Sequence, residues 1–580
     1  MPTPHTDTVP PTAILPVDQA EGEQSARTST VLHKTSDRLW WALTGLVLLA
    51  GVLGQIRVWA SDRGFWNDEL YVAVNIRGKG FAGLALGGLR YAQVAPPGWL
   101  MGEHAIYKVL GGDEQVMKFP QLFASATVLV LTTVVAYKCV GRWAALAVAV
   151  LLALAPQLYY YAGELKQYSV EAAVAMIIML VMGVFGVAAR GRPLKRRFLI
   201  GLSAVMAIVT PASYSALVVV VGSAAGVALL AGIEKRWRVA MTTALVAAPA
   251  ALIGAGQAWL RMQMAFMSDQ DSFFPNGFPP EHAGPVEIIQ WLPRMWEGFI
   301  VNPMRWGLPQ VALVLAVLGV AALVIRGRAV WAAVFVGVFS AAIGAAIVGG
   351  LPLEERVALY LVGPTLILVV AALDGGVRAL IALSRQVSGR PLNAAAAIAM
   401  AFALAAGLSG LALAVKPAAV AAYEEVRQPL YRDNARDIMR DVKQRLQPGD
   451  VVLVYDFSQP LASWYGEEYG LPIVGLIGPA HVCDTTTVDK ALAGAKRVWY
   501  IRGARLSYHP DNYHAHVLAE LAKRGRLVES QLYAPQTQAA YSSSAWTLID
   551  LTGEPDPNPP TPEPNNDPVY NCAVVLPDWH

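Results

Sequence analysis

The sequence has little charge and little cysteine for its length. Asp, Glu, Lys and Arg make up 15% of its 580 residues, whereas charged residues make up about 25% of soluble domains. So few charges are not enough to cover a water-facing surface of this size, which argues against an ordinary cytosolic enzyme. Three cysteines exclude a disulfide scaffold, and no Cys or His spacing indicates a structural zinc site.

The sequence also lacks an excess of one charge and a phosphate-binding glycine motif. Its 45 basic and 42 acidic residues leave a net charge of +3. The basic residues are scattered in small clusters between apolar runs, so we expect no nucleic-acid partner. The chain contains neither a GxGxxG motif nor a P-loop, so no nucleotide-binding site is indicated.

Long apolar runs dominate the first 415 residues. A transmembrane helix needs about 20 mainly apolar residues. We count eleven candidate spans, of which the fifth is short. They cover residues 39–59, 119–137, 143–162, 172–189, 198–211, 215–232, 239–260, 308–325, 329–351, 357–373 and 394–415. This pattern predicts a polytopic α-helical membrane protein with about 11 transmembrane helices.

The basic clusters between these runs predict the orientation. With the N-terminus in the cytoplasm, all of them fall on the cytoplasmic side, as expected for short loops. They lie at residues 138–142, 190–197, 235–238, 326–328 and 378–390. Segment 96–110 is too short and too interrupted to span, and is predicted as an interfacial or re-entrant helix on the outer side. Residues 1–38 are polar and predicted to be a disordered cytoplasmic tail.

Residues 39–415 therefore form the predicted transmembrane domain, with long outer loops at 60–118 and 261–307. The second loop is rich in Trp, Phe, Met and Pro and is predicted to be a lid lying on the lipid surface. Residues 416–552 alternate helical and strand-like segments, which predicts an extracytoplasmic α/β domain. The strands are expected at 451–457, 497–501, 526–533 and 546–551, and the helices at 433–446 and 513–524.

A Pro-rich tail, 553–580, follows this domain. Cys483 and Cys572 both fall on the outer side of the predicted topology. They form either a disulfide that ties back the tail or two separate thiols, and the sequence leaves both possibilities open.

Two adjacent carboxylates, Asp68 and Glu69, lie in the first outer loop within Phe65-Trp66-Asn67-Asp68-Glu69-Leu70. A general base must remain ionised and within hydrogen-bond reach of the acceptor hydroxyl. A carboxylate pair beside the membrane suits that task. Taken alone, the pair is equally well explained as a solvated loop end.

Charged residues also follow the third span, where only a very short loop fits. Glu164 and Lys166 lie in this stretch, which ends in Tyr168 and Ser169. Ionisable groups at membrane depth are functional candidates. They are either site residues or a local ion pair.

Arg356 opens the tenth span from the outer side, next to Glu355. A guanidinium there suits a phosphate, which it binds through two parallel hydrogen bonds. The alternative is an arginine that reaches the membrane surface or pairs with a neighbouring glutamate. Arg90 and Gln93, just before Ala95-Pro96-Pro97-Gly98, are predicted from proximity to line the same cavity.

Together these motifs resemble the C-type membrane glycosyltransferases, in the bacterial branch related to protein O-mannosyltransferases and lipid A aminoarabinose transferases. The matching features are the Asp-Glu pair, Ala-Pro-Pro-Gly, a Phe-Pro in the second span, Tyr-x-x-Glu-x-Lys-x-Tyr and Glu-Arg-x-x-x-Tyr. The resemblance covers residues 39–415. It departs from the aminoarabinose transferases at Gln93 and Val94, which stand where those enzymes carry an acidic-basic pair.

The resemblance implies a polyprenyl-phosphate sugar as donor and an extracytoplasmic glycan, lipid or protein of the cell envelope as acceptor. By motif position, Asp68 would be the general base of an inverting transfer, with Glu69 its neighbour. Glu164, Lys166, Tyr168, Glu355, Arg356, Arg90 and Gln93 would bind substrate. A divalent metal is possible in such a family but is not indicated, since Glu164 stands where some relatives have Asp.

The main alternative function is a multi-pass transporter or flippase of an envelope lipid or glycan precursor. Eleven spans and a short broken helix near residue 210 suit a transporter. Against it, the two halves show no internal repeat, and the polar residues gather on one side of the membrane. A second alternative is a non-catalytic scaffold protein that the membrane part merely anchors. An anchor needs only one span, so eleven spans argue against it.

Overall fold

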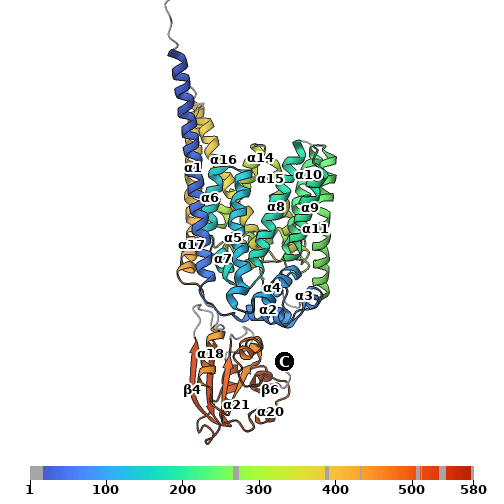
Figure 1. Ribbon diagram of the computed structural model, residues 1–580, viewed down its shortest axis with the longest axis vertical. Coiled ribbons are helices and arrows are strands. Elements are labelled where there is room, and N and C mark those ends of the chain that lie inside the picture. The colour runs from blue at the N-terminus through green and yellow to red at the C-terminus, as the bar shows by residue number, and fades with distance from the viewer. Residues whose placement is uncertain are drawn as a thin grey trace, which may run out of the picture.

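The computed structural model describes residues 17–191, 193–264, 274–385, 391–430, 434–503, 510, 512–533 and 544–576. A bundle of long helices forms one part of the molecule, and a smaller sheet domain lies at one end of it (Figure 1). The predicted fold class, a polytopic helical membrane protein with a C-terminal α/β domain, is confirmed.

Every predicted span forms a helix in the bundle. The long helices are α1 (Val17–Trp59), α5 (Glu114–Cys139), α6 (Arg142–Ala153) with α7 (Pro156–Tyr160) and η2 (Tyr161–Gly163), α8 (Tyr168–Gly191), α9 (Arg196–Val209), α10 (Ser215–Ile233), α11 (Trp237–Met264), α14 (Pro309–Ile325), α15 (Ala329–Ile347), η4 (Glu355–Leu361) with α16 (Val362–Arg385), and α17 (Pro391–Arg427). The tenth span therefore begins as the 3₁₀ turn η4.

Not all of these helices are long enough to cross a bilayer. Among the described residues, eight helices are long and apolar enough, or nine if α6 and α7 with η2, bent by 65°, count as one span. α14 is a shorter apolar helix, and α9 has only 14 residues. Proline at position 156 explains the bend, because it cannot donate the backbone hydrogen bond that would continue α6.

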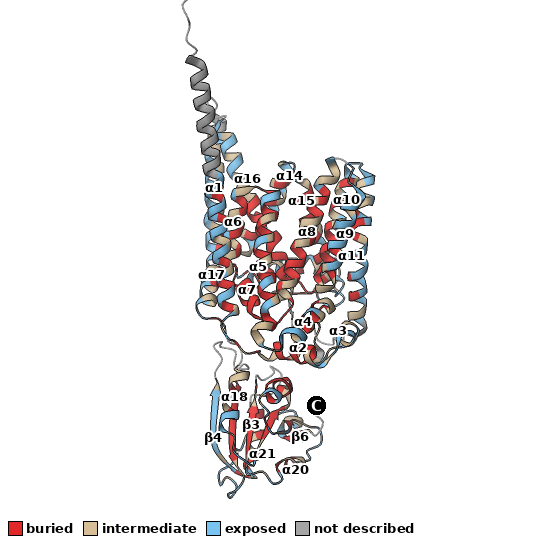
Figure 2. Cartoon of the chain, in the orientation of Figure 1, coloured by how far each residue is buried: buried red, intermediate tan, exposed pale blue. Residues whose placement is uncertain are grey.

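Burial separates central from peripheral helices (Figure 2). The most apolar window of α8 is 61% buried inside the protein, whereas that of α17 is 17% buried. Large apolar side chains such as Phe402 and Leu413 are exposed along α17. Such a surface suits lipid rather than water. α8 therefore forms the centre of the bundle and α17 its periphery.

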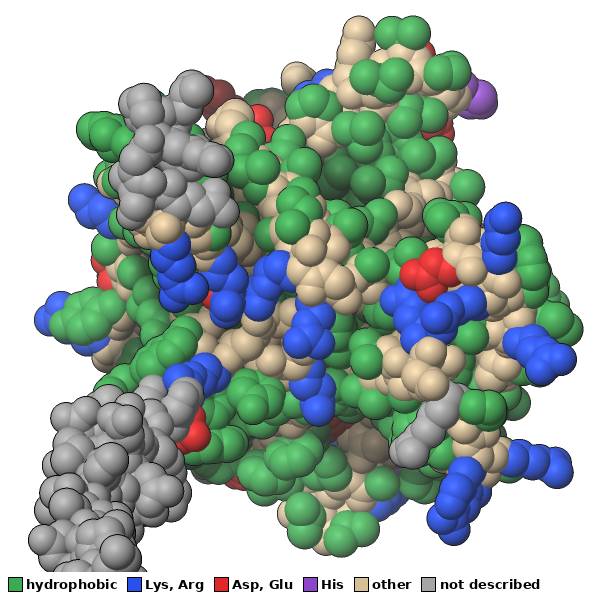
Figure 3. All heavy atoms as spheres, turned by 90° about the horizontal axis from the view of Figure 1, so that it is seen from above, with side chains coloured by type: hydrophobic (Ala, Val, Ile, Leu, Met, Phe, Trp, Pro, Cys, Tyr) green, Lys and Arg blue, Asp and Glu red, His purple; other side chains and the backbone are tan. Residues whose placement is uncertain are grey.

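The ends of the bundle differ in charge. The basic clusters at the predicted cytoplasmic loops all lie at the end away from the sheet domain (Figure 1). Seen from that end, Lys and Arg side chains run across the face with few acidic side chains (Figure 3). Residues 386–390, at the end of one predicted cluster, lie outside the described residues.

Three short helices lie between the bundle and the sheet domain. They are α2 (Asn67–Gly78), α3 (Phe81–Leu86) and α4 (Pro97–Leu110) (Figure 1). The segment that was expected to form an interfacial or re-entrant helix is therefore a helix, α4. The second long loop contains α13 (Pro285–Val301), which packs against α14 and η4. Two tryptophans of this loop, Trp291 and Trp306, are buried, so they anchor the segment to the protein.

The C-terminal domain is built on a six-stranded mixed sheet. Its spatial order is β4-β5-β3-β1-β2-β6, with β1 parallel to both β2 and β3 and the other pairs antiparallel. The strands are β1 (Asp450–Tyr455), β2 (Ile473–Gly478), β3 (Arg497–Arg502), β4 (Arg526–Tyr533), β5 (Ser544–Asp550) and β6 (Val574–Leu576). Its helices are α18 (Ala435–Arg445), α19 (Gln459–Leu461), η6 (Ala462–Gly466), α20 (Thr486–Leu492) and α21 (Tyr513–Ala522).

Alternate residues of the strands supply two hydrophobic cores. Leu453 and Tyr500 face a core with α20 and α21. Val452 and Trp499 face the other core, which also contains Phe65 from the first outer loop. One side of the sheet therefore shares its hydrophobic core with the helices at the end of the bundle.

Several boundaries differ from those expected. α1 begins at Val17, inside the predicted disordered tail; residues 1–16 lie outside the described part. α17 continues to Arg427, past the expected end of the last span. β2 and β6 were not expected, and β6 lies in the predicted Pro-rich tail. Cys572 beside it is bonded to Cys483, which decides between the two possibilities that the sequence left open.

Candidate active site

Asp68 and Glu69 occupy the first turn of α2, where negative charge is favoured by the helix dipole. The two side chains have different surroundings. The Glu69 Oε2 accepts a hydrogen bond from the Trp66 backbone N–H at 3.1 Å, which satisfies a free donor at the helix start. Its Oε1 accepts one from the Leu165 N–H at 2.5 Å. Glu69 therefore joins α2 to the loop before α8.

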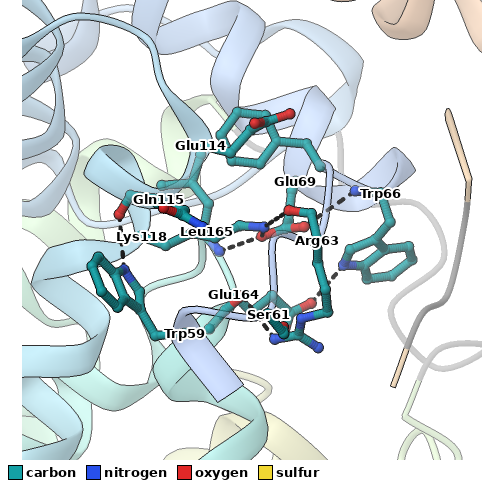
Figure 4. A network of polar contacts seen from close by, with 12 residues as sticks. Trp59, Ser61, Arg63, Trp66, Glu69, Glu114, Gln115, Lys118, Glu164 and Leu165 are labelled. Carbon is teal, nitrogen blue, oxygen red and sulfur yellow. Dashed lines mark hydrogen bonds and ion pairs between the residues drawn. The ribbon is translucent and has the colours of Figure 1, made fainter. Parts of the chain in front are cut away.

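Glu69 is also the partner of a buried lysine. The Lys118 Nζ lies 3.5 Å from Glu69 Oε1 and donates to the Arg63 carbonyl at 2.9 Å. Glu69 and Lys118 are each only 2% exposed. Figure 4 shows these contacts converging beneath the start of α2. With its oxygens engaged and buried, Glu69 is placed to hold the loop together.

Asp68 points to a different neighbour. Its Oδ2 lies 3.0 Å from the Lys166 Nζ, and the side chain of Asp68 is 22% exposed while that of Lys166 is 5% exposed. The same ammonium donates to Gln93 Oε1 at 3.1 Å. Residues from three separate stretches of sequence thus meet at one cation. Of the two adjacent carboxylates, Asp68 is the one that a substrate can reach.

Glu164 lies beside this cluster. Its Oε1 accepts hydrogen bonds from the Trp66 indole N–H at 2.7 Å and from the Tyr160 hydroxyl at 3.2 Å (Figure 4). Glu164 thereby orients Trp66, two residues before Asp68. Within the described residues, no group of three or more His, Cys, Asp or Glu side chains is arranged to hold a metal ion.

Arg356 approaches the cluster from η4. Its guanidinium lies 5.9 Å from the centre of the Tyr168 ring and 5.8 Å from that of Phe274, and it interacts electrostatically with Asp68. It also forms a loose ion pair of 3.8 Å with Glu355, whose side chain is 38% exposed. The buried Arg356 Nε has no hydrogen-bond partner within the described residues. This leaves donor capacity for an anionic ligand.

The Ala95-Pro96-Pro97-Gly98 segment positions Gln93. A Cβ on Gly98 would lie 2.6 Å from the Pro211 backbone, so only glycine permits this close approach. The Tyr214 hydroxyl donates to the Ala95 carbonyl at 3.0 Å. Arg90 differs from the prediction: its side chain is exposed, and its backbone pairs with Asn75 instead.

Several contributing residues were not anticipated. Arg63 donates to the carbonyls of Gly163 and Leu430, both at 2.9 Å, and Lys118 lies under Glu69. Both are charged residues close to an apolar run, and this feature of the sequence could have marked them as candidates. Their partners lie far away in sequence, so the contacts themselves could not be inferred.

A further buried carboxylate, that of Glu103, lies on α4. Glu103 is 1% exposed and accepts a hydrogen bond from the Gln121 amide at 2.7 Å. Burial raises the pKa of Glu103 to about 8. This shift favours the protonated, uncharged form of the side chain.

No family model and no curated protein matches the sequence. Similar solved structures exist. ArnT from Cupriavidus metallidurans in the apo state has a TM-score of 0.45 and 15% identity, over 90% of this chain and 98% of that one. The Archaeoglobus fulgidus oligosaccharyltransferase tethered to an acceptor peptide with the NVT sequon has a TM-score of 0.48 and 12% identity, over 87% and 74%.

Two related structures are complexes. ArnT bound to undecaprenyl phosphate has a TM-score of 0.42 at 14% identity, covering 90% of this chain and 99% of that one. The archaeal oligosaccharyltransferase AglB with an inhibitory peptide and a dolichol-phosphate has a TM-score of 0.42 at 11% identity, covering 85% and 73%. These neighbours are membrane glycosyltransferases, the group that the sequence motifs resemble.

Proposed function

We propose that this chain is a membrane glycosyltransferase that transfers a sugar from a polyprenyl-phosphate donor to an acceptor outside the cytoplasm. One observation carries the proposal: the accessible carboxylate of Asp68 is paired with Lys166 at 3.0 Å, and Arg356, whose Nε has no partner in the part of the chain that the structure describes, stands near the same carboxylate. A base and two phosphate-binding cations are the groups that this reaction needs.

The donor phosphate binds the cations. Arg356 offers a planar guanidinium suited to two phosphate oxygens, and Lys166 supplies a point charge. Both oppose the negative charge that builds up on the phosphate as it leaves, so they stabilise the transition state more than the ground state. Tyr168 and Phe274 flank Arg356 and restrict where its guanidinium can lie.

Asp68 acts on the acceptor. Its carboxylate takes the proton of the acceptor hydroxyl while the oxygen attacks the anomeric carbon from the side opposite the phosphate. The bond between that carbon and the phosphate oxygen breaks, the bond to the acceptor oxygen forms, and polyprenyl phosphate leaves with the electron pair. The configuration at the anomeric carbon is inverted.

Two features support an extracytoplasmic site. The Cys483–Cys572 disulfide lies in the sheet domain, and disulfides persist in oxidising compartments. The basic clusters lie at the other end of the bundle (Figure 3), as expected for a cytoplasmic face. The cluster around Asp68 lies at the end nearer the sheet domain, together with α2.

The test compares the envelope glycans of a deletion strain complemented with wild type, Asp68→Asn or Asp489→Asn, at equal membrane levels by immunoblot. Asp489 is an exposed aspartate of α20 and serves as the matched control. We expect wild type and Asp489→Asn to restore a sugar that Asp68→Asn does not. Full restoration by Asp68→Asn would reject Asp68 as the base.

A further inference from the structure

The sheet domain contacts the segment that carries Asp68 through a buried tyrosine. The Tyr465 hydroxyl of η6 accepts a hydrogen bond from the Phe65 backbone N–H at 2.7 Å and donates one to Glu114 Oε1 at 2.7 Å. Tyr465 and Phe65 are both 0% exposed. A buried N–H without a partner is costly, so this hydroxyl fixes the backbone three residues before Asp68.

An arginine of the sheet domain holds the chain just before this point. The Arg436 Nη1 of α18 lies 2.9 Å from Asp62 Oδ1 and 3.1 Å from Glu114 Oε2. A Cβ on Gly64 would lie 2.9 Å from the Arg436 Cβ and 3.2 Å from the Tyr465 hydroxyl. The loop from Asp62 to Phe65 is thus packed tightly between α18 and η6.

The far end of α2 is held as well. Arg77, in its last turn, donates to the Ser463 carbonyl and forms an ion pair of 2.9 Å with Glu467. Its guanidinium lies 4.7 Å from the centre of the Trp464 ring, and the same indole packs edge-on against Phe65 at 5.5 Å. The loop before α2 and the last turn of α2 therefore both contact η6 or Glu467, the residue that follows it.

We propose that the C-terminal domain positions the general base, and that Tyr465 is a positioning residue for Asp68. The inference rests on the proposed function of Asp68 and goes beyond it, because it assigns the sheet domain a role in the chemistry of the membrane domain. A displacement of about 1 Å in a reacting group lowers the rate by about a hundredfold. The sheet domain thus contacts α2 and the loop before it at both ends, in addition to the contacts that Glu69 makes with Leu165 and Lys118.

The test uses the full-length protein with Tyr465→Phe, which removes only the hydroxyl. The matched control is Tyr469→Phe, one helical turn away, whose ring stacks on Tyr465 at 6.1 Å. Three readouts are combined: envelope glycan restored in the deletion strain at equal membrane levels, hydrogen exchange of residues 62–77 in the purified protein, and its Tm. Asp68→Asn is run in parallel.

For Tyr465→Phe we expect faster exchange in residues 62–77, a Tm lowered by about a few degrees because the buried Phe65 N–H loses its partner, and about ten- to a hundredfold less glycan. Tyr469→Phe should match wild type in all three. Wild-type exchange and glycan levels in Tyr465→Phe, with Asp68→Asn inactive, would overturn the positioning role alone. An active Asp68→Asn would instead reject the proposed base.

If Tyr465→Phe does not accumulate in the membrane, Arg436→Gln tests the same contact from α18. It removes the bonds to Asp62 and Glu114 while leaving the Tyr465 hydroxyl in place. Faster exchange in residues 62–77 together with reduced glycan supports the positioning role. Wild-type behaviour in both readouts contradicts it.

Discussion

The Lys166 ammonium lies 3.0 Å from the Asp68 carboxylate and 3.1 Å from the Gln93 carbonyl oxygen. The same cation therefore contacts the carboxylate proposed as the base and the amide of a residue just before the Ala95-Pro96-Pro97-Gly98 segment. Removing this cation would change the surroundings of both side chains.

Replacing Lys166 should impair catalysis more than folding. Lys166→Gln removes the cation shared by Asp68 and the phosphate, so we expect at least about tenfold less glycan, as one lost charged hydrogen bond predicts. The measurement is the glycan content of the complemented deletion strain at equal membrane levels. Lys195→Gln, on the basic face, is the control and should match wild type.

Arg356 should determine affinity for the lipid phosphate. Arg356→Lys keeps the charge but loses the fork geometry, so binding of undecaprenyl phosphate to the purified protein should weaken about tenfold. Native mass spectrometry or fluorescence titration measures the change. Arg294→Lys, on the exposed side of α13, should bind as wild type does. Equal affinities in all three proteins would remove Arg356 from the phosphate site.

Glu69 and Asp68 should differ in their effect on stability. Glu69→Gln leaves the buried Lys118 ammonium without its carboxylate, and breaking a buried ion pair costs about 3 to 5 kcal/mol. Asp68 is 22% exposed, so water screens its pair with the buried Lys166, and Asp68→Asn should destabilise the protein less than Glu69→Gln does. Thermal unfolding in detergent compares the two. A Tm of Glu69→Gln equal to that of wild type would contradict the structural role.

Glu103 should make the stability depend on pH. Burial raises its pKa from the ordinary value of 4.5 to about 8 in the folded protein. A carboxyl group that binds its proton more tightly when folded favours the folded state at low pH, and this advantage is lost as the pH rises from about 4.5 through about 8. Glu103→Gln cannot ionise. Its Tm should fall less than that of wild type between pH 5 and 9, and equal slopes would contradict the shift.

The disulfide provides a test of sidedness. Cys572→Ser frees the Cys483 thiol, which lies at an exposed position and should then react with a membrane-impermeant maleimide added to intact cells. Wild type should react only after reduction, because Cys139 is buried in the bundle. Labelling of Cys572→Ser only after the cells are opened would place the sheet domain in the cytoplasm.

The architecture and part of the site could be predicted from the residue types and their order. Runs of about 20 apolar residues must be placed in lipid whatever their tertiary contacts. For that reason the spans, the alternating basic clusters and the α/β domain could be predicted. Lys166 was singled out because a charge is costly at membrane depth unless it has a partner. Arg356 was singled out as a guanidinium at the start of an apolar run, and Asp68 as one of two adjacent carboxylates in an outer loop.

Tertiary structure decided what depends on side-chain direction and on distant partners. Asp68 and Glu69 are adjacent and chemically alike, yet helix geometry turns one toward Lys166 and buries the other against Lys118. β6 pairs with β2, and the nearby Cys572 is bonded to Cys483, both of them distant in the sequence. The hydroxyl of Tyr465 reaches Phe65 across 400 residues of chain. No local sequence pattern predicts such a contact, because the two residues come together only when the two domains pack against each other.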